Sequence, residues 1–241
     1  MVVGEAVPLL EAVDVVRTYP GGGGVTAVRG VSVRLHRREF GLLMGPSGSG
    51  KTTFMGTLAG FDPPDAGEVR WEGRPFDRLE AGEIQDVRRR RLGMIFQSYG
   101  LLPSLSAVEN VELPLRIAGT GLDEARERAM RWLERLGLGD RTHHRAFELS
   151  GGQQQRVAVA RALVVEPDVV LADEPIAEVD SENADLILSA LWDVVVRDGA
   201  VLAATHNPEA LAYASRVLLF RDGVIKAEGT PDEVAAQLTT D

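Results

Sequence analysis

The chain of 241 residues contains no cysteine, so it offers neither disulfide bonds nor thiolate ligands for a metal. Its four histidines are scattered and lack the spacing of a zinc site. No apolar run approaches the roughly 20 residues that cross a bilayer, and the N-terminus lacks the basic and apolar regions of a signal peptide. The sequence therefore suits a reducing compartment, and we expect it to serve a membrane only through another chain.

Positive charge is also scarce. Lys and Arg number 26 against 36 Asp and Glu, which gives a formal net charge of −10 at pH 7. A nucleic-acid-binding domain would be expected to carry a broad basic face, so we expect no nucleic-acid partner. The basic run Arg88–Arg91 is the exception. It is interpreted as a solvated helix face, with contact to a partner or to acidic lipid heads as the alternative.

Apolar residues make up 44% of the chain, enough for one α/β domain with a small lobe attached. Strands are predicted over the first 40 residues, with Gly21–Gly24 as a hairpin loop, and again at 67–73. A hairpin at 217–225 precedes a helix starting near Pro231. Residues 99–140 are predicted to be helical, with an apolar face formed by Ala125, Ala129, Trp132, Leu133 and Leu136.

Residues 45–53 have the spacing of a phosphate-binding loop: glycine, four residues, glycine, lysine, hydroxyl. The glycines allow a tight turn whose N–H groups surround the β-phosphate of a nucleoside triphosphate. An apolar run before the loop and a helical pattern after it supply the expected order of strand, loop and helix. A chance glycine-rich turn is the alternative. The predicted nucleotide-binding residues are Gly45, Pro46, Ser47, Gly48, Ser49, Gly50, Lys51, Thr52 and Thr53.

Two of these side chains have specific expected roles. Lys51 reaches the β- and γ-phosphates, and the Thr52 hydroxyl coordinates Mg²⁺ at the start of the helix. Downstream, the apolar run 169–172 ends in two carboxylates, Asp173 and Glu174. Asp173 is placed to hold the ion, and Glu174 to polarise the attacking water. Such a pair is often structural in α/β proteins, but its position after a phosphate loop favours catalysis.

With Leu149-Ser150-Gly151-Gly152-Gln153 added to these motifs, the chain resembles the ATP-binding cassette (ABC) family, specifically the nucleotide-binding domain of a transporter, from about residue 10 to 234. The resemblance implies an α/β P-loop NTPase core with a mixed sheet, an antiparallel β subdomain and a smaller helical subdomain. It places the core at about 1–98 and 150–241 of a single domain, and the helical subdomain at about 99–149. ATP and Mg²⁺ are the implied cofactors, and ATP hydrolysis is the implied activity.

In that family two domains pair head to tail, and each ATP lies between the phosphate loop of one and the Ser-Gly-Gly-Gln turn of the other. The resemblance therefore implies a homodimer with ATP at the interface. The turn here, Ser150, Gly151, Gly152 and Gln153, opens a predicted helix that can present backbone amides to the γ-phosphate. A serine-glycine helix cap is the other reading, and the two roles are compatible.

Further positions match the family by resemblance. Tyr19 stands where an aromatic ring stacks on adenine, with simple packing as the alternative. Gln97 matches the glutamine that touches Mg²⁺ and water, His206 the histidine that contacts the γ-phosphate, and Asp180 the loop that crosses to the other site. The implied catalytic residues are Lys51, Gln97, Glu174 and His206, and the implied metal ligands are Thr52, Gln97 and Asp173.

The loop before Asp180 departs from the family pattern, which commonly has threonine and leucine where this chain has Ile176 and Val179. Glu178 adds a charge between them, and Asn207 replaces a frequent aspartate. The departures in the loop before Asp180 put communication between the two sites in doubt. Since Lys51, Glu174 and His206 are intact, hydrolysis is still expected.

Residues 101–111 and 171–175 look most like the bacterial group that drives lipoprotein release, macrolide or peptide export, and cell-division signalling. The resemblance implies a peripheral ATPase on the cytoplasmic side of the cell membrane that drives a separate permease. Two alternatives stay open: a regulatory ATPase that signals through a membrane partner to cell-wall enzymes, and a soluble ABC ATPase. The soluble relatives carry a long coiled-coil insertion or two cassettes, and neither is present here. The transported substrate is not predicted.

Overall fold

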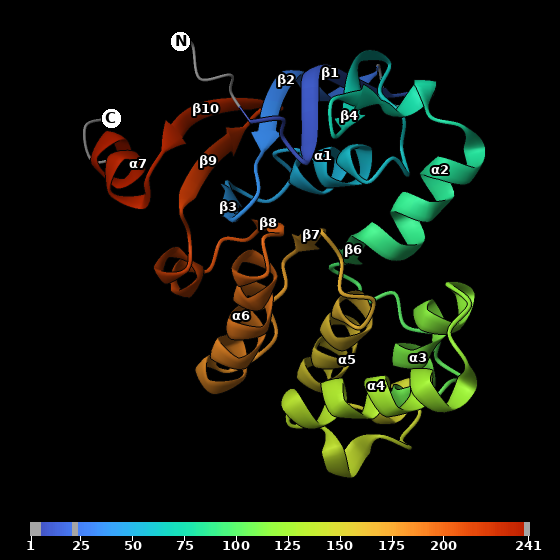
Figure 1. Ribbon diagram of the computed structural model, residues 1–241. Helices are drawn as coiled ribbons and strands as arrows, with labels where there is room; N and C mark the ends of the chain where they lie inside the picture. Colours follow the sequence, from blue (N-terminus) through green and yellow to red (C-terminus); the bar gives the residue numbers. More distant parts are fainter. Residues whose placement is uncertain (1–5, 21–23, 239–241) are drawn as a thin grey trace.

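The computed structural model describes residues 6–20 and 24–238, so all of the predicted Gly21–Gly24 loop except Gly24 lies outside the described residues. A six-stranded sheet forms the centre, in the order β10-β9-β3-β8-β7-β6 (Figure 1). The pairs β3–β8, β3–β9, β7–β8 and β6–β7 are parallel, and β10 is antiparallel to β9. The strands are β3 (Glu39–Met44), β6 (Leu92–Ile95), β7 (Val169–Asp173), β8 (Ala200–Ala204), β9 (Arg216–Arg221) and β10 (Val224–Gly229).

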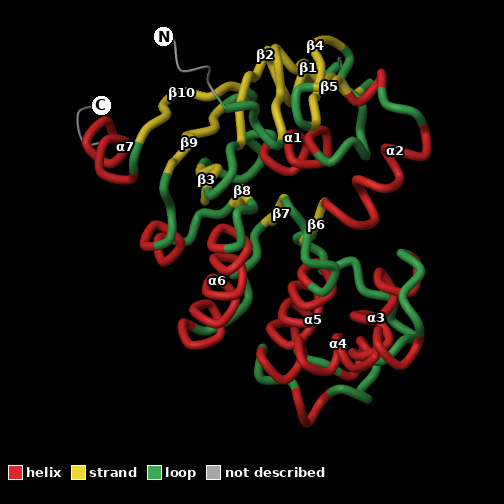
Figure 2. Tube along the Cα trace, in the orientation of Figure 1, coloured by secondary structure: helices red, strands yellow, loops and turns green. Residues whose placement is uncertain are grey.

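A second sheet has four antiparallel strands in the order β2-β1-β4-β5. They are β1 (Leu10–Tyr19), β2 (Val25–Leu35), β4 (Ala66–Trp71) and β5 (Arg74–Pro75). Helix α1 (Lys51–Leu58) lies between the two sheets, as Figures 1 and 2 show. The mixed central sheet, the antiparallel sheet and the helices confirm the predicted fold class.

Helices α5 (Gly151–Leu163) and α6 (Ser181–Val196) lie on the opposite side of the central sheet from α1, and α3 (Ala107–Ile117) and α4 (Leu122–Arg135) pack beside α5 (Figure 1). The remaining elements are short: η1 (Phe76–Arg78), α2 (Ala81–Asp86), η2 (Val87–Arg91), η3 (Gly139–Arg141), η4 (Ala146–Glu148), η5 (Pro208–Ala212) and α7 (Pro231–Leu238). Within residues 6–20 and 24–238, no helix combines the length and apolar character that a membrane span requires. The division into core and helical subdomain stays a prediction.

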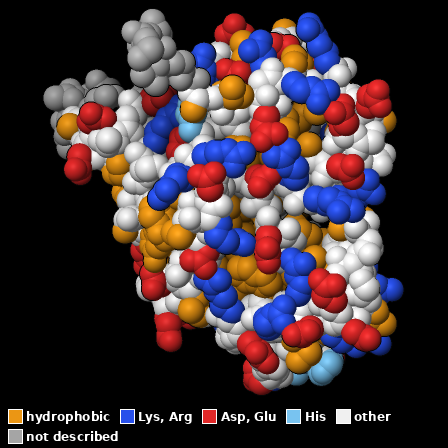
Figure 3. All heavy atoms as spheres, in the orientation of Figure 1, with side chains coloured by type: hydrophobic (Ala, Val, Ile, Leu, Met, Phe, Trp, Pro, Cys, Tyr) orange, Lys and Arg blue, Asp and Glu red, His pale blue; other side chains and the backbone are white. Residues whose placement is uncertain are grey.

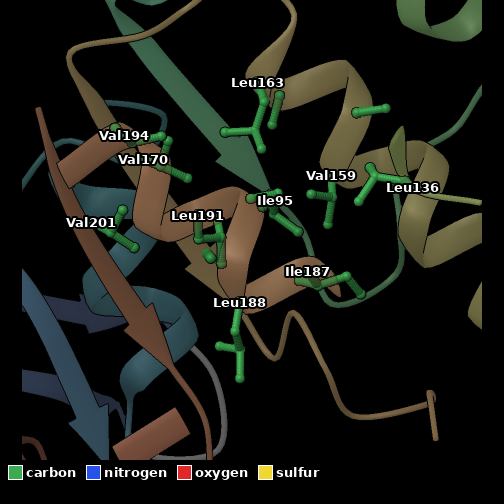
Figure 4. Packing of buried hydrophobic residues seen from close by; sticks show 14 of the residues in the cluster. Ile95, Leu136, Val159, Leu163, Val170, Ile187, Leu188, Leu191, Val194 and Val201 are labelled. Atoms are coloured by element: carbon green, nitrogen blue, oxygen red, sulfur yellow. The ribbon is translucent and has the colours of Figure 1, made fainter. Parts of the chain in front are cut away.

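The core lies on both faces of the central sheet because strand side chains alternate. On β7, Val170 and Ala172 join the cluster that packs against α5 and α6, where Figure 4 shows Val170 near Leu191 and Val194. Val169 and Leu171 join the cluster on the other face, which includes α1. The apolar run before Asp173 therefore has no solvent-facing side, as expected for a central parallel strand.

The register of the parallel strands brings three chain segments to one edge of the sheet. Leu43 pairs with Ala204, and Ala204 pairs with Asp173. The segments that follow β3, β8 and β7 consequently leave the sheet side by side. The phosphate loop, the Thr205-His206 segment and Glu174 begin at these ends.

Residues 99–106, predicted to be helical, form a loop with a turn at 103–104 instead, and α3 begins only at Ala107. Asn110 explains this difference because its fully buried side chain takes the hydrogen bonds that a helix would have made locally. Its Oδ1 accepts from Leu102 N at 2.8 Å, and its Nδ2 donates to the carbonyls of Leu102, Leu105 and Ser106 at 3.1, 3.3 and 3.0 Å.

Replacing Asn110 with alanine should lower the free energy of unfolding by about 2–4 kcal/mol, because it strands several buried backbone groups. For a chain of this size the expected drop in Tm is about 5–15 °C, measured by calorimetry. Asn183→Ala, at a partly buried capping position of α6, is the control and should have a smaller effect. A variant at position 110 that melts with the parent would contradict this account of the loop.

The basic run Arg88–Arg91 forms most of the π-helical turn η2, and all four arginines have partners within the chain. The partners are the Gly60 carbonyl for Arg88, Asp86 for Arg89, the Ala118 carbonyl for Arg90, and Glu72 and Asp168 for Arg91. Arg91 also lies over the Trp71 ring, 5.0 Å from its centroid. The run is thus partly exposed but internally bonded, and Arg91 ties the end of β4 to the start of β7.

Candidate nucleotide-binding site

The phosphate loop runs from the end of β3 to the start of α1. At two of its glycines, no residue with a Cβ can be accommodated. Gly45 has φ of 156°, and a Cβ there would lie 1.9 Å from the Phe220 carbonyl oxygen. Gly50 has φ of 107°, and a Cβ there would lie 2.2 Å from the Ala27 carbonyl oxygen. The loop therefore approaches neighbouring backbone so closely that only glycine fits.

Lys51 is the first residue of α1, and its side chain is only 7% exposed. Its Nζ donates hydrogen bonds to the carbonyls of Gly45 at 2.8 Å and Pro46 at 3.0 Å. The ammonium group is thus held across the loop, at the positive end of the helix, where an incoming phosphate would be attracted to both.

Asp173, at the end of β7, is 2% exposed. Burial raises the pKa of its carboxyl group and the nearby Glu174 raises it further, while a hydrogen bond from Thr52 and the charge of Lys51 lower it. The Thr52 hydroxyl, the Asp173 carboxylate and the Gln97 amide belong to residues that line one cavity. Oxygen donors of this kind suit a hard cation such as Mg²⁺, so the side chains present fit the implied ion.

Glu174 occupies a left-handed backbone conformation with φ of 50°, which is unusual for a residue with a side chain. Its amide donates to the Ala204 carbonyl at 2.7 Å and so ties it to β8. Glu174 Oε1 lies 2.9 Å from His206 Nδ1. Its Oε2 is buried and has no hydrogen-bond partner among the described residues. One carboxylate oxygen is thereby oriented by the histidine, and the other is free to accept a proton.

A cavity of about 240 Å³ brings together nine of the predicted site residues. Its lining comprises Ala27, Ser47, Gly48, Gly50, Lys51, Thr52, Thr53, Gln97, Asp173 and Glu174. Size alone would not have identified it, because a cavity of about 400 Å³ between α1, β4 and α2 contains no predicted site residue. Ala27 was not predicted, since an alanine on a strand carries no local signal for a ligand.

The remaining predicted residues do not line this cavity. Ser150 caps α5: its Oγ accepts from Gln153 N at 3.4 Å, and its own N donates to Gln153 Oε1 at 3.0 Å. Asp180 caps α6, accepting from Asn183 N at 2.9 Å, and this bond lowers the pKa of its carboxyl group. The Ser-Gly-Gly-Gln turn and Asp180 therefore belong to a second surface of the chain.

Tyr19 likewise lies outside the cavity lining, at the end of β1. Its hydroxyl donates to Asp62, and the Arg17 guanidinium lies 5.0 Å from the centre of its ring. Arg17 also pairs with Asp62 at 2.5 Å. These two neighbours fix the orientation of the ring. The contact with Asp62 was not predictable because Asp62 is far from Tyr19 along the chain.

Fold and site together define a P-loop nucleoside triphosphatase: a parallel sheet whose strand ends carry a lysine-bearing glycine loop, a buried aspartate and a glutamate paired with histidine. The profile of the family described as ABC transporter matches residues 28–177. Because that match covers more than half of the chain, the protein belongs to the ABC transporter family.

Relatives in the curated proteins agree. A macrolide export ATP-binding/permease protein, MacB, of Hyphomonas neptunium is 43% identical over 233 residues, which cover 95% of this chain and 36% of that protein. An uncharacterized ABC transporter ATP-binding protein of Thermotoga maritima is 43% identical over 219 residues, which cover 90% of this chain and 94% of that protein. The chain thus spans about a third of the length of the MacB relative and nearly all of the Thermotoga one.

Among solved structures, the dimeric bacterial ABC transporter cassette MJ0796 has a TM-score of 0.87 and 35% identity, over 92% of this chain and 98% of that one. A post-hydrolysis dimer of the same cassette bound to ADP and Pi has a TM-score of 0.86. The predicted family, fold class and ATPase class are confirmed, and the chain is an ATP-binding domain.

Proposed function

We propose that two copies of this chain hydrolyse ATP between them and drive a membrane permease. The observation that carries the proposal is the division of the predicted site. Lys51, Thr52, Asp173 and Glu174 line one cavity, whereas the turn at 150–153 lies outside it. A head-to-tail pair would bring the turn of one copy to the cavity of the other. The related cassette is dimeric in two solved structures, one of them bound to ADP and Pi, which supports pairing of two copies.

The chemistry follows from the charges in the cavity. Lys51 and the N-terminus of α1 offset the negative charge of the β- and γ-phosphates. The oxygen of a water molecule attacks the γ-phosphorus, the bond to ADP breaks, and Glu174 accepts the proton that the water loses. His206 holds Glu174 in place through the 2.9 Å contact. Thr52, Asp173 and Gln97 would hold Mg²⁺, which supplies further neutralisation of phosphate charge when bound. Tyr19 and Asp180 keep their proposed roles at adenine and at the second site.

A groove beside Gln97 is the proposed contact with the permease. It has a volume of about 310 Å³, and Phe61, Phe96 and Ile117 are among its lining residues. The Phe61 and Phe96 rings lie 5.9 Å apart, and Phe61 and Ile117 are 53% and 56% exposed. Since Phe96 immediately precedes Gln97, a permease segment in this groove would touch the backbone next to the nucleotide cavity.

We further propose that the chain acts at the cytoplasmic side of the membrane, in export or lipoprotein release. The names of the relatives support this direction: one is called a macrolide export protein, and another, of Pseudomonas putida, a pyoverdine export protein. The chain carries 41% identity to the latter, over 96% of its own length and 36% of that protein. The proposed division into core and helical subdomain places the groove where the two meet.

The test is affinity purification of the tagged chain from its native membranes in mild detergent, followed by mass spectrometry. A permease with a large extracytoplasmic domain should co-purify, and Phe61→Glu should lose it while keeping ATP affinity. Val196→Glu, at a 61% exposed position on α6, is the matched control. Recovery of ribosomal or DNA-repair proteins without a membrane protein would contradict the transporter proposal and leave the ATPase chemistry intact.

A further inference from the structure

The loop that departs from the family pattern makes a contact with the segment that follows Gln97. The Tyr99 hydroxyl donates a hydrogen bond to Glu178 Oε2. The pair lies next to Gly151, the first residue of α5. A Cβ added to Gly151 would be 2.7 Å from Glu178 Oε2 and 3.1 Å from the Tyr99 hydroxyl. Three segments distant in the sequence therefore meet at the turn formed by residues 150–152.

Tyr99 is a fixed point from which to hold the carboxylate. Its backbone has φ of 60°, and Arg161 of α5 donates to the carbonyls of Tyr99 at 2.8 Å and Gly100 at 2.6 Å. Burial, together with the bond to Glu178, raises the pKa of the Tyr99 hydroxyl to about 12, so at neutral pH it is the proton donor of the pair. The backbone at Tyr99 is thus hydrogen-bonded to α5, the helix that begins at Gly151.

The partner of Glu178 in this bond is a neutral hydroxyl and not a cation, so the bond itself does not pair the carboxylate with a positive charge. A negative charge beside the N-terminus of a helix is stabilised by the helix dipole and by the unpaired N–H groups. In the proposed function the same helix end receives the γ-phosphate of ATP held by the other copy. Two anions at one helix end repel each other.

We propose that Tyr99 holds the Glu178 carboxylate at the Ser-Gly-Gly-Gln turn of its own chain, where it opposes the ATP-driven pairing of two copies. The incoming γ-phosphate has to approach the turn against the negative charge of Glu178. It sets the ATP concentration at which the dimer closes. The inference rests on the proposed function, because it requires ATP to be shared between two chains.

The test uses the full chain carrying Glu174→Gln, so that hydrolysis does not consume the dimer. Light scattering at increasing ATP should show that adding Glu178→Gln lowers the concentration for half-maximal dimerisation by about two- to fivefold per site. Glutamine keeps the hydrogen-bond acceptor for Tyr99, so a purely structural role would leave this concentration unchanged. ATP affinity of the monomer, measured with a fluorescent ATP analogue at low protein concentration, should stay the same.

Two further variants sharpen the result. Tyr99→Phe releases the carboxylate and should shift dimerisation in the same direction, with no additional effect when combined with Glu178→Gln. Glu134→Gln, at an exposed position of α4, removes one charge elsewhere and should change nothing. Added salt should shrink the difference between Glu178→Gln and its parent, since it screens the repulsion.

The outcomes separate the two proposals. A dimer that forms at the same ATP concentration with and without Glu178→Gln would overturn this inference alone. An equal gain from Glu134→Gln would overturn it too, because net charge would then explain the shift. If the Glu174→Gln chain forms no ATP-dependent dimer at all, the head-to-tail site fails, and the inference fails with it.

Discussion

Replacing Glu174 with glutamine is expected to reduce the rate of ATP hydrolysis by about 10²–10⁴-fold while ATP binding persists. In the parent chain, Glu174 Oε1 lies 2.9 Å from His206 Nδ1. Glutamine has the shape of glutamate and can still face His206, but it cannot take a proton from water. It also removes a negative charge beside the γ-phosphate, so the ATP-bound pair should accumulate. Steady-state kcat and size-exclusion chromatography with ATP measure the two effects.

The partly buried position of Glu174 makes this substitution informative. Because its backbone is tied to Ala204 at 2.7 Å, the change of one side-chain atom should not move the loop. His206→Ala, which leaves the carboxylate but removes its neighbour, should have a smaller effect on kcat. Hydrolysis by Glu174→Gln at near the parent rate would exclude Glu174 as the base, and would point to another residue of the cavity.

The parts of the fold that follow from local chemistry were predictable from the sequence. Apolar runs without alternation indicated the strands β3 and β7. The Ser-Gly-Gly-Gln turn predicted the start of α5, where Ser150 and Gln153 form a reciprocal cap. The glycines of the phosphate loop predicted a tight turn, and the structure adds that a Cβ at Gly45 or Gly50 would collide with neighbouring backbone.

The features that were not predictable depend on partners far away in the sequence. Helical periodicity extended the helix back to Tyr99, but the buried Asn110 side chain holds residues 102–106 in a loop. The run Arg88–Arg91 was interpreted as a solvated face, whereas Gly60, Ala118 and Asp168 supply its partners. No local pattern encodes which distant groups will meet.

The candidate site divides in the same way. Spacing alone identified Lys51, Thr52, Asp173 and Glu174, since each lies directly at the end of a predicted strand or the start of a helix. The sequence marked Glu178 as unusual, but it could not place Tyr99 against it, because that contact requires the path of the chain between β6 and α3. The catalytic and metal-binding residues of a site can thus be predicted from the sequence, whereas the residues that contact and modify them are identified only from the structure.

Replacing Lys51 with alanine should weaken ATP binding by about 10²–10⁴-fold, because charge-assisted hydrogen bonds contribute about 1.5–3 kcal/mol each and the ammonium group can reach two phosphates. Among the residues that line the described cavity, Lys51 is the one with a cationic side chain. Equilibrium binding of a fluorescent ATP analogue measures the loss. Hydrolysis should fall with it.

Lys226 offers a matched control because it is the other lysine of the chain and lies exposed on β10. Lys226→Ala should bind ATP as the parent does. Lys51→Ala should also keep a Tm close to that of the parent, since the hydrogen bonds of the lysine within the described residues go to two loop carbonyls, those of Gly45 and Pro46, which water can bind in its place. A large drop in Tm would mean that the lysine holds the loop together. Retained ATP affinity would instead mean that the backbone N–H groups and the helix end suffice to bind the phosphates, and that the lysine acts on the transition state alone.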